Sequence, residues 1–238
     1  MLTQRTIILT GASSGIGRET AVQLLDAGHN VIGIARDFSK QPLHADNFQK
    51  ISMDFADIAA CEIRLKELSK TFSRVTDIIC CAGMGRFGSL EEFSYTQIKT
   101  LMDVNFLSQA YVVRAFLPKL KQQGEGNVVF VGSEAALAGA RRGSVYCASK
   151  FALRGFAQAL REECCGNAIR VSIVNPGMVN TPFFDELDFS PGESQENYIE
   201  ATDVAAAIIW ILNSRAETVI DEIILSPLKK VIAKKPSK

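Results

Sequence analysis

Short apolar runs alternate with helical patterns along almost the whole chain. The expected strands are residues 5–10, 31–36, 48–53, 76–82, 127–132 and 169–175, with a further candidate at 219–225. Helical patterns fall between them, at residues 57–73, 96–120, about 146–165 and 202–212. Apolar strands separated by helices are typical of a parallel sheet that is covered on both faces. We therefore predict an α/β fold, a single domain over residues 1–228 built on one doubly wound parallel sheet of about seven strands.

A glycine-rich turn links the first expected strand to the first helix. The sequence Gly11-Ala-Ser-Ser-Gly-Ile-Gly17 leads into a helical pattern that Gly28 ends. Such a loop lets the backbone approach a pyrophosphate, and the helix N-terminus adds N–H donors and a partial positive charge. The Gly-x-x-x-Gly-x-Gly spacing is not the commoner Gly-x-Gly-x-x-Gly, so a plain tight turn is the alternative. We predict a Rossmann-like dinucleotide site at Gly11, Ser13, Ser14, Gly15, Ile16 and Gly17.

The end of the second expected strand bears on the choice of cofactor. NAD sites place a carboxylate there to bind the ribose 2′-hydroxyl, whereas this chain has Ala35 followed by Arg36. A guanidinium binds the 2′-phosphate of NADP through charge-assisted bonds. The alternatives are that Arg36 is a solvated charge, or that Asp37 pairs with it or competes for a hydroxyl. We expect NADP(H), with NAD(H) possible.

Tyr146 and Lys150 are spaced four residues apart in a helical pattern, so they lie on one face, one turn apart. A phenol is a poor acid near neutral pH, because its ordinary pKa is about 10. An ammonium one turn away favours the phenolate and lowers that pKa. The pair is therefore a candidate for proton transfer to or from a substrate oxygen.

Other polar and glycine residues are expected at the same edge of the sheet. Ligands of doubly wound sheets bind beyond the C-terminal ends of the strands. Gly83, Ser133 and the pair Pro176-Gly177 each follow an expected strand. Asn105 lies inside an otherwise apolar helix face and needs a polar partner. One crevice therefore collects the glycine loop, Arg36 and these residues.

In order along the chain, these motifs resemble those of the short-chain dehydrogenase/reductase family. The resemblance covers nearly the whole length. It rests on the loop from Thr10 to Gly17, on Asn105, on Ser133 thirteen residues before Tyr146-x-x-x-Lys150, and on Asn175-Pro176-Gly177 with Val179 and Thr181.

The resemblance implies hydride transfer between nicotinamide and a small carbonyl or alcohol. Tyr146 would be the general acid in reduction and the base in oxidation, and Lys150 would lower its pKa and hold the nicotinamide ribose. Ser133 would donate a hydrogen bond to the substrate oxygen. Asn105 would hold, through its helix backbone, a water that links Lys150 to solvent. Further implied cofactor contacts are Asp54, Phe55, Cys81, Ala82, Gly83, Tyr146, Lys150, Pro176, Gly177, Val179 and Thr181. A homodimer or homotetramer is also implied, joined through the helices that contain Asn105 and Tyr146.

The chain departs from the family pattern in two places. Cys80-Cys81 stands where the family usually has Asn-Asn, which predicts cofactor binding that survives but is weakened. Cys81 could also confer sensitivity to thiol oxidants, although small buried core residues are the simpler interpretation. The segment from Asp221 to Pro227 lacks the usual Asp-Gly-Gly, and it is similar to the branch of 3-hydroxy-acid and serine dehydrogenases over a short match only.

Substrate contacts are expected from the variable loops at this edge. The candidates are Met84, Arg86, Phe87, Glu134, Leu137, Arg141, Arg142, Met178, Phe183 and Phe184. Arg141 or Arg142 could anchor an anionic substrate, but solvated loop charges are the simpler interpretation. Residues 178–200 form the expected mobile lid, with Met178, Phe183 and Phe184 giving it an apolar surface.

The composition excludes several other functions. The 238 residues carry a formal net charge of zero, which predicts no nucleic-acid partner, and no run is long enough for a membrane span. Six cysteines without a nearby histidine predict reduced thiols, no metal site and a cytoplasmic location. Residues 229–238 read as a basic, frayed tail. A non-catalytic nucleotide-binding or regulatory protein remains the alternative function, and a sugar-nucleotide epimerase is disfavoured because the chain is short for a second domain.

Overall fold

The computed structural model describes residues 4–235. Its main sheet has seven parallel strands in the order β10-β6-β5-β4-β1-β2-β3. They are β1 (Thr6–Thr10), β2 (Asn30–Ala35), β3 (Phe48–Ser52), β4 (Asp77–Cys80), β5 (Gly126–Val131), β6 (Ile169–Pro176) and β10 (Glu222–Leu225). The chain winds outward from β1 to β3 and then returns to β4 on the other side of β1. This reversal between β1 and β4 is where a doubly wound sheet forms its ligand crevice.

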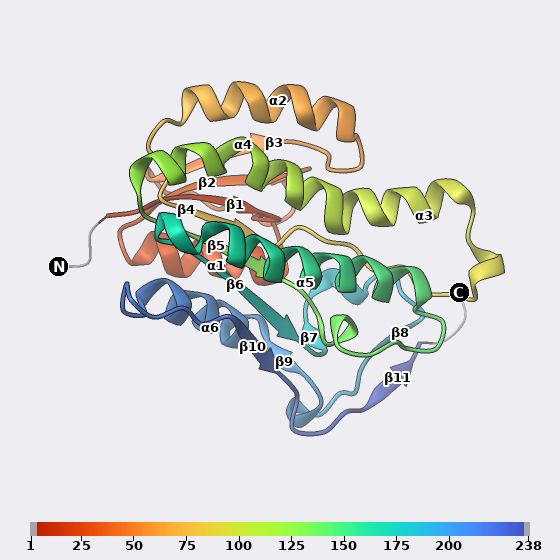
Figure 1. Cartoon of the computed structure of the whole chain (residues 1–238). Helices are drawn as coiled ribbons and strands as arrows, with labels where there is room; N and C mark the ends of the chain where they lie inside the picture. The colour runs from red at the N-terminus through yellow and green to blue at the C-terminus, as the bar shows by residue number, and fades with distance from the viewer. Residues whose placement is uncertain (1–3, 236–238) are drawn as a thin grey trace.

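Helices cover both faces of the sheet (Figure 1). They are α1 (Gly15–Asp26), α2 (Ile58–Thr71), α3 (Tyr95–Met102), α4 (Ser108–Gln123), α5 (Ser144–Cys164) and α6 (Ala201–Asn213). Buried residues of α1 and α6 pack on one face, and those of α2, α4 and α5 pack on the other. The strands are apolar on both sides because both sides are buried, as the sequence indicates. The predicted Rossmann-like fold is confirmed.

The long helix expected over residues 96–120 is interrupted. A π-helical turn spans Asp103–Leu107 between α3 and α4, and it contains Asn105. Pro118 lies inside α4, which nevertheless continues to Gln123. The π-helical turn shifts the backbone bonding by one residue at Asn105, and such turns are often found at functional sites.

The segment after β6 carries small strands that the sequence did not predict. Strand β7 (Val179–Asn180) pairs with β9 (Ile199–Glu200), and β8 (Phe189–Pro191) pairs antiparallel with β11 (Ile232–Lys234). Short helical turns complete the chain: η1 (Leu90–Glu92), η3 (Glu134–Ala136), η4 (Cys165–Asn167), η5 (Pro182–Phe184) and η6 (Gln195–Asn197). The expected lid is therefore an ordered segment with its own pairing.

Residues 229–235, which the sequence analysis assigns to a frayed tail, make backbone and side-chain contacts with the segment after β6. Lys229 donates its backbone N–H to the Glu196 carbonyl at 2.8 Å and its ammonium to the Glu196 carboxylate at 2.7 Å. The Lys235 backbone N–H bonds to the Asp188 carbonyl at 2.8 Å. A lysine-rich composition predicts that this segment is exposed to solvent. The backbone of β8, however, provides a strand with which β11 pairs. Residues 236–238 lie outside the described part of the chain.

Candidate active site

Close backbone packing shapes the glycine loop between β1 and α1. A Cβ on Gly17 would lie 2.2 Å from the Gly11 carbonyl oxygen, so the helix start rests directly on the loop. Gly11 has φ +70°, and a Cβ there would lie 2.9 Å from the Ala82 nitrogen. Gly15 has φ +51°, and a Cβ added to it would lie 3.2 Å from the Thr181 Cβ. The loop therefore brings together the segments after β1, β4 and β6, as the sequence predicts.

The N-terminus of α1 fits a bound phosphate group. Its N-cap, Ser14, makes no side-chain hydrogen bond to the first turn. The N–H groups of that turn consequently remain available to an anion, and the helix dipole favours negative charge there. Together with the narrow glycine loop, this is the arrangement that the pyrophosphate of a dinucleotide requires.

The Cys80-Cys81 departure is offset by other side chains around Ala82. The Ala82 backbone N–H bonds to the Thr10 hydroxyl at 3.0 Å, and its carbonyl accepts from Gln109 at 2.8 Å. Cys80 is buried, and burial raises its pKa well above the usual value; burial also raises the pKa of Cys81 to about 12. Both thiols are therefore protonated near neutral pH. The backbone after β4 is held in place without the two asparagines, and the sequence analysis missed Thr10 and Gln109 in this role.

Arg36 follows β2 at the same edge and is exposed. Asp37 does not pair with it, because the Asp37 carboxylate accepts the Ser39 backbone N–H at 2.8 Å and the Ser39 hydroxyl at 2.7 Å. Asp54 and Phe55 follow β3 nearby; Asp54 accepts the Ala56 backbone N–H at 3.0 Å, and Phe55 is buried in the core. The guanidinium of Arg36 is thus free of the acidic neighbour that could have competed for it.

Tyr146 and Lys150 both lie near the start of α5 and are almost completely buried, with 7% and 5% exposure. The Lys150 Nζ lies 5.9 Å from the centroid of the Tyr146 ring and donates to the Val131 carbonyl at 3.2 Å. Burial raises the pKa of Tyr146 to about 12, although hydrogen bonding with Ser133 opposes the rise. Burial lowers the pKa of Lys150 to about 8, although the Cys81 thiol opposes that shift. The expected lowering of the Tyr146 pKa is not found, because desolvation outweighs the other effects.

Asn105 connects the π-helical turn to the site. It is fully buried, its amide oxygen accepts the Met84 backbone N–H at 2.8 Å, and its amide nitrogen donates to the Met84 carbonyl at 3.0 Å. The same nitrogen donates to the Ser149 hydroxyl at 3.1 Å. A Cβ on Gly83 would lie 3.5 Å from the Asn105 amide oxygen and 3.6 Å from the Lys150 ammonium. Asn105, Gly83 and Lys150 therefore meet in one place, and Ser149 joins them as a residue that the sequence analysis missed.

Ser133 is held by a chain of polar side chains. Its backbone N–H donates to the Asn175 amide oxygen at 3.0 Å, and the Asn175 amide nitrogen donates to Glu222. Glu222 in turn accepts two bonds from Arg154, each 2.8 Å long. Arg154 lies one helical turn beyond Lys150 on the same face of α5. The sequence analysis missed Arg154 and Glu222, which are distant in sequence and carry no motif.

The segment that was expected to cover the nicotinamide starts at the end of β6. The Gly177 backbone N–H donates to the Leu225 carbonyl at 2.8 Å, which ties this segment to β10. Pro176 and Val179 are buried, and the Thr181 hydroxyl donates to the Val179 carbonyl at 3.3 Å. This segment approaches the glycine loop, where a Cβ on Gly15 would lie 3.2 Å from Thr181, and the residue after Ser133, where a Cβ on Gly177 would lie 3.4 Å from Glu134.

The charged substrate candidates are engaged elsewhere or exposed. Glu134 pairs with Lys230 at 2.6 Å, and Arg142 pairs with Glu92 at 3.2 Å. Arg86 and Arg141 are exposed to solvent. Leu137 and Met178, which are uncharged, are half-buried.

The aromatic candidates lie close to Tyr146. The ring centroid of Phe87 is 4.9 Å from that of Tyr146, and the ring centroid of Phe183 is 6.1 Å from it.

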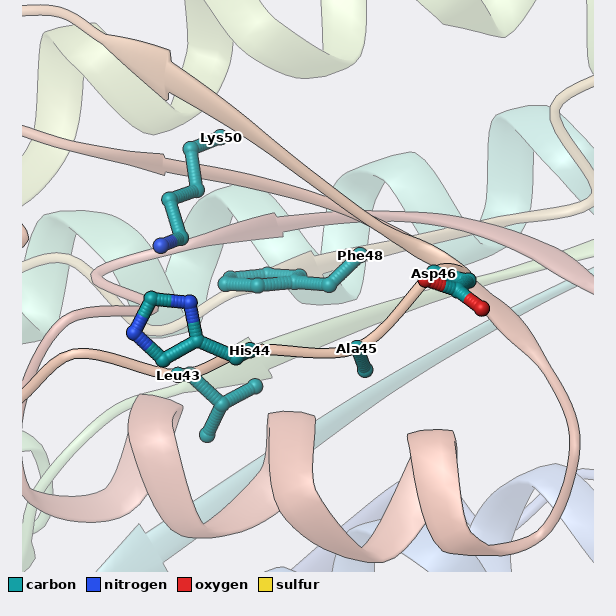
Figure 2. A pocket seen from close by; sticks show the side chains of 6 residues that line it. All are labelled: Leu43, His44, Ala45, Asp46, Phe48 and Lys50. Atoms are coloured by element: carbon teal, nitrogen blue, oxygen red, sulfur yellow. The ribbon is translucent and has the colours of Figure 1, made fainter.

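A separate hollow lies along strand β3 (Figure 2). It measures about 380 Å³ and is lined by Leu43, His44, Ala45, Asp46, Phe48 and Lys50. No predicted catalytic or cofactor residue lines it, so it is distinct from the crevice.

Residues 4–235 contain no group of three or more His, Cys, Asp or Glu side chains placed to hold a metal ion. None of their helices combines the length and the apolar character needed to cross a membrane.

Comparison with known proteins identifies the family. Residues 5–190 match the family model described as short chain dehydrogenase. An uncharacterized oxidoreductase of Staphylococcus epidermidis is 26% identical over 229 residues, covering 94% of this chain and 98% of that protein. Human 17-beta-hydroxysteroid dehydrogenase type 1 is 32% identical over 217 residues, covering 84% of this chain and 63% of that enzyme.

A solved structure is similar over nearly the whole chain. The closed form of serine dehydrogenase complexed with NADP+ superposes with a TM-score of 0.80 at 26% identity, covering 92% of this chain and 94% of that one. The family match covers most of the chain. The chain therefore belongs to the short-chain dehydrogenase/reductase family of NAD(P)-dependent oxidoreductases.

Proposed function

We propose that this protein transfers hydride between NADP(H) and a small carbonyl or alcohol substrate, with Tyr146 as the general acid or base. The observation that carries the proposal is the convergence of Ser133, Tyr146, Lys150 and Asn105 on the crevice that the glycine loop borders. When bound, the nicotinamide supplies or accepts the hydride. This chain's own residues position the reactants and move the proton.

In carbonyl reduction, the Tyr146 phenol donates its proton to the substrate oxygen. A pKa of about 12 keeps the phenol protonated at neutral pH, so it is ready to act as an acid. The Ser133 hydroxyl donates a hydrogen bond to the same oxygen as negative charge develops there. Lys150 stabilises the phenolate that remains, and its ammonium lies beside Gly83 and Asn105, which favours their joint role in returning a proton from solvent. In alcohol oxidation the proton moves in the opposite direction.

Four groups of residues would hold the cofactor. The loop residues Gly11, Ser13, Ser14, Gly15, Ile16 and Gly17 and the start of α1 would bind the pyrophosphate. Arg36 would bind the 2′-phosphate, which favours NADP over NAD, and an NADP+ complex exists for the similar serine dehydrogenase. Asp54, Phe55, Cys81, Ala82 and Gly83 would border the adenosine, while Lys150 and Pro176, Gly177, Val179 and Thr181 would border the nicotinamide end.

The proposal extends to assembly and location. We propose a homodimer or homotetramer joined through α4 and α5, and a cytoplasmic location, where six free thiols stay reduced. Phe106, Tyr111 and Phe156 pack against the core, whereas Phe151 of α5 is exposed and could join such an interface. Light scattering on the wild type and on Phe151→Glu tests this: the variant should dissociate if α5 is in the interface.

The experiment that tests the reaction uses NADPH labelled with deuterium at the nicotinamide C4. The purified protein is incubated with labelled NADPH and a panel of aldehydes and ketones, and the alcohols are analysed by mass spectrometry. Deuterium on the carbinol carbon demonstrates hydride transfer from the cofactor. A protein that binds NADPH but yields no labelled alcohol from any carbonyl, and no NADPH from any alcohol, would instead be the non-catalytic nucleotide-binding protein.

A further inference from the structure

A closed circuit of five aromatic rings includes the catalytic tyrosine. Tyr146 contacts Phe87 at 4.9 Å and Phe183 at 6.1 Å between ring centroids. Phe183 contacts Phe184 at 5.2 Å, Phe184 contacts Phe189 at 5.8 Å, and Phe189 returns to Phe87 at 5.0 Å. We call these four phenylalanines and Tyr146 the aromatic circuit. Its spacings all fall in the range of favourable edge or tilted aromatic contacts.

Separate segments build the circuit, and the backbone fixes each of them. Phe87 lies in the loop after β4, where the Gly88 N–H bonds to the Arg142 carbonyl at 2.7 Å. Phe183 and Phe184 belong to η5, and Phe183 lies directly on the backbone of Gly85, where a Cβ would be 2.5 Å from its ring. Phe189 begins β8 and is held by the pairing with β11.

The C-terminal strand β11 therefore takes part in building the site. It pairs Lys234 with Phe189 in register, and the Lys235 ammonium bonds to the Phe184 carbonyl. A frayed tail could not hold these two rings. The ordered tail thus explains how a loop-borne aromatic wall stays in place beside Tyr146.

Charges near the circuit are paired or exposed, except that the half-buried Lys235 donates its ammonium to the Phe184 carbonyl. Lys230 from the same C-terminal segment pairs with Glu134, next to Ser133, at 2.6 Å. Glu92 pairs with Arg142 at 3.2 Å. Lys150 already donates to the Val131 carbonyl and is the buried cation of the catalytic group itself. The wall beside Tyr146 is apolar and aromatic, and the two cations next to it, Lys150 and Lys235, each already donate to a backbone carbonyl rather than standing ready for a substrate carboxylate.

We propose that the substrate is an uncharged carbonyl compound, or the matching alcohol, with a flat aromatic body attached at or next to the reacting carbon. This rests on the hydride-transfer function proposed above and names its substrate class. The carbonyl oxygen meets Ser133 and Tyr146, and the aromatic body inserts against Phe87 and Phe183, the two direct neighbours of Tyr146. Small substrates that carry a carboxylate, such as 3-hydroxy acids and serine, which the short similarity at residues 221–227 suggests, are disfavoured because burying their carboxylate without a partner is costly.

Three aldehydes of similar size test the proposal with NADPH as reductant. Benzaldehyde carries a flat ring, cyclohexanecarbaldehyde carries a ring that is apolar but not flat, and 4-carboxybenzaldehyde adds an anion. We expect kcat/KM for benzaldehyde to exceed that for cyclohexanecarbaldehyde by tenfold or more, and that for 4-carboxybenzaldehyde by a hundredfold or more. Equal values for benzaldehyde and 4-carboxybenzaldehyde, or a preference for the anion, would overturn the proposal.

Variants locate the preference. Phe87→Leu and Phe183→Leu keep the side chain apolar but remove the ring, so each should lower the ratio of kcat/KM for benzaldehyde to kcat/KM for cyclohexanecarbaldehyde about tenfold. Phe72→Leu is the matched control, because Phe72 packs against the core on the other side of the sheet from α1 and outside the circuit. A loss that is equal for both aldehydes would show that the rings only support the fold, and would contradict a role in selectivity.

A binding measurement distinguishes a failure of the proposed aromatic substrate class from a failure of the proposed hydride-transfer function. Benzyl alcohol and 4-(hydroxymethyl)benzoate are titrated calorimetrically into the protein saturated with NADP+. Selective binding of benzyl alcohol without any turnover would refute the hydride-transfer function and keep the aromatic site. Turnover of aliphatic or anionic aldehydes that Tyr146→Phe abolishes, without binding of benzyl alcohol, would refute the aromatic site and keep the function.

Discussion

Removing the Asn175 amide should misplace Ser133 and impair both stability and turnover. In Asn175→Ala the Ser133 N–H loses its acceptor at 3.0 Å, and an unsatisfied, partly buried N–H costs about 1–2 kcal/mol. Glu222 loses one donor but keeps both bonds from Arg154, so we add only about 0.5–1 kcal/mol. The total of about 1.5–3 kcal/mol corresponds to a fall in Tm of about 3–12 °C for a chain of this length.

The catalytic effect should be separate from cofactor binding. A shift of Ser133 by a fraction of an ångström weakens the hydrogen bond to the substrate oxygen, and we expect kcat to fall roughly tenfold to a hundredfold. The Kd for NADPH should stay within about twofold, because the amide does not border the glycine loop. Thermal unfolding, nicotinamide fluorescence titration and steady-state turnover measure the three quantities.

Two controls make this prediction sharp. Asn47→Ala removes an amide that bonds to the Leu25 and His29 carbonyls far from the crevice, so it should lower Tm but leave kcat unchanged. The N175D variant places a second carboxylate opposite that of Glu222, and the two repel each other. In the double variant N175D/E222Q an amide that can donate a hydrogen bond replaces the Glu222 carboxylate, so most of kcat should be recovered. Asn175→Ala with wild-type kcat, or a double variant no better than N175D, would refute the reasoning.

Three further predictions concern pH and cofactor choice. The reduction rate should be constant through neutral pH and fall above about pH 8, because Lys150 then loses the proton that stabilises the Tyr146 phenolate. Lys150→Arg should move this fall to higher pH. A rate that stays constant up to pH 10 would contradict this role of Lys150. Arg36→Ala should raise the Kd for NADPH roughly tenfold to a hundredfold and leave that for NADH unchanged, since it removes charge-assisted bonds to the 2′-phosphate; equal effects on both cofactors would show that Arg36 is a bystander. Burial and the nearby Arg5 lower the pKa of His29 below 6.5, so the unfolded chain takes up the proton first and stability is lost as the pH falls below about 6.5. In urea unfolding, His29→Gln should weaken this loss of stability at acidic pH. An unchanged loss would assign it to other groups.

The alternation of strands and helices could be predicted because it depends on local patterns. Each strand is a short apolar run, and each helix has a period that survives tertiary packing. The interruption of the helix at Asn105 could not be predicted, since the π-helical turn is linked to hydrogen bonds between Asn105 and the backbone of Met84, 21 residues away. The C-terminal strand escaped prediction for a similar reason: the three residues Ile232–Lys234, in a tail that carries several lysines, give no strand signal until β8 lies beside them.

The catalytic residues could be predicted from motif spacing, but their electrostatics could not. Sequence shows that Lys150 is one turn from Tyr146, and that neighbour alone would lower the phenol pKa. It does not show that both side chains are buried, and burial raises the pKa of Tyr146 instead. Arg154 and Glu222 are 68 residues apart, so their link to Ser133 through Asn175 becomes visible only in the folded chain.

Single-turnover hydride transfer in wild type and Tyr146→Phe tests the central claim most directly. Each protein is first saturated with NADPH and then mixed with an aldehyde that the wild type reduces, and the loss of nicotinamide absorbance is followed. The account predicts that both proteins bind NADPH with similar Kd, while the variant transfers hydride about 10²–10⁴-fold more slowly because the proton donor is gone. Equal rates in the two proteins would contradict the assignment of Tyr146 as the general acid.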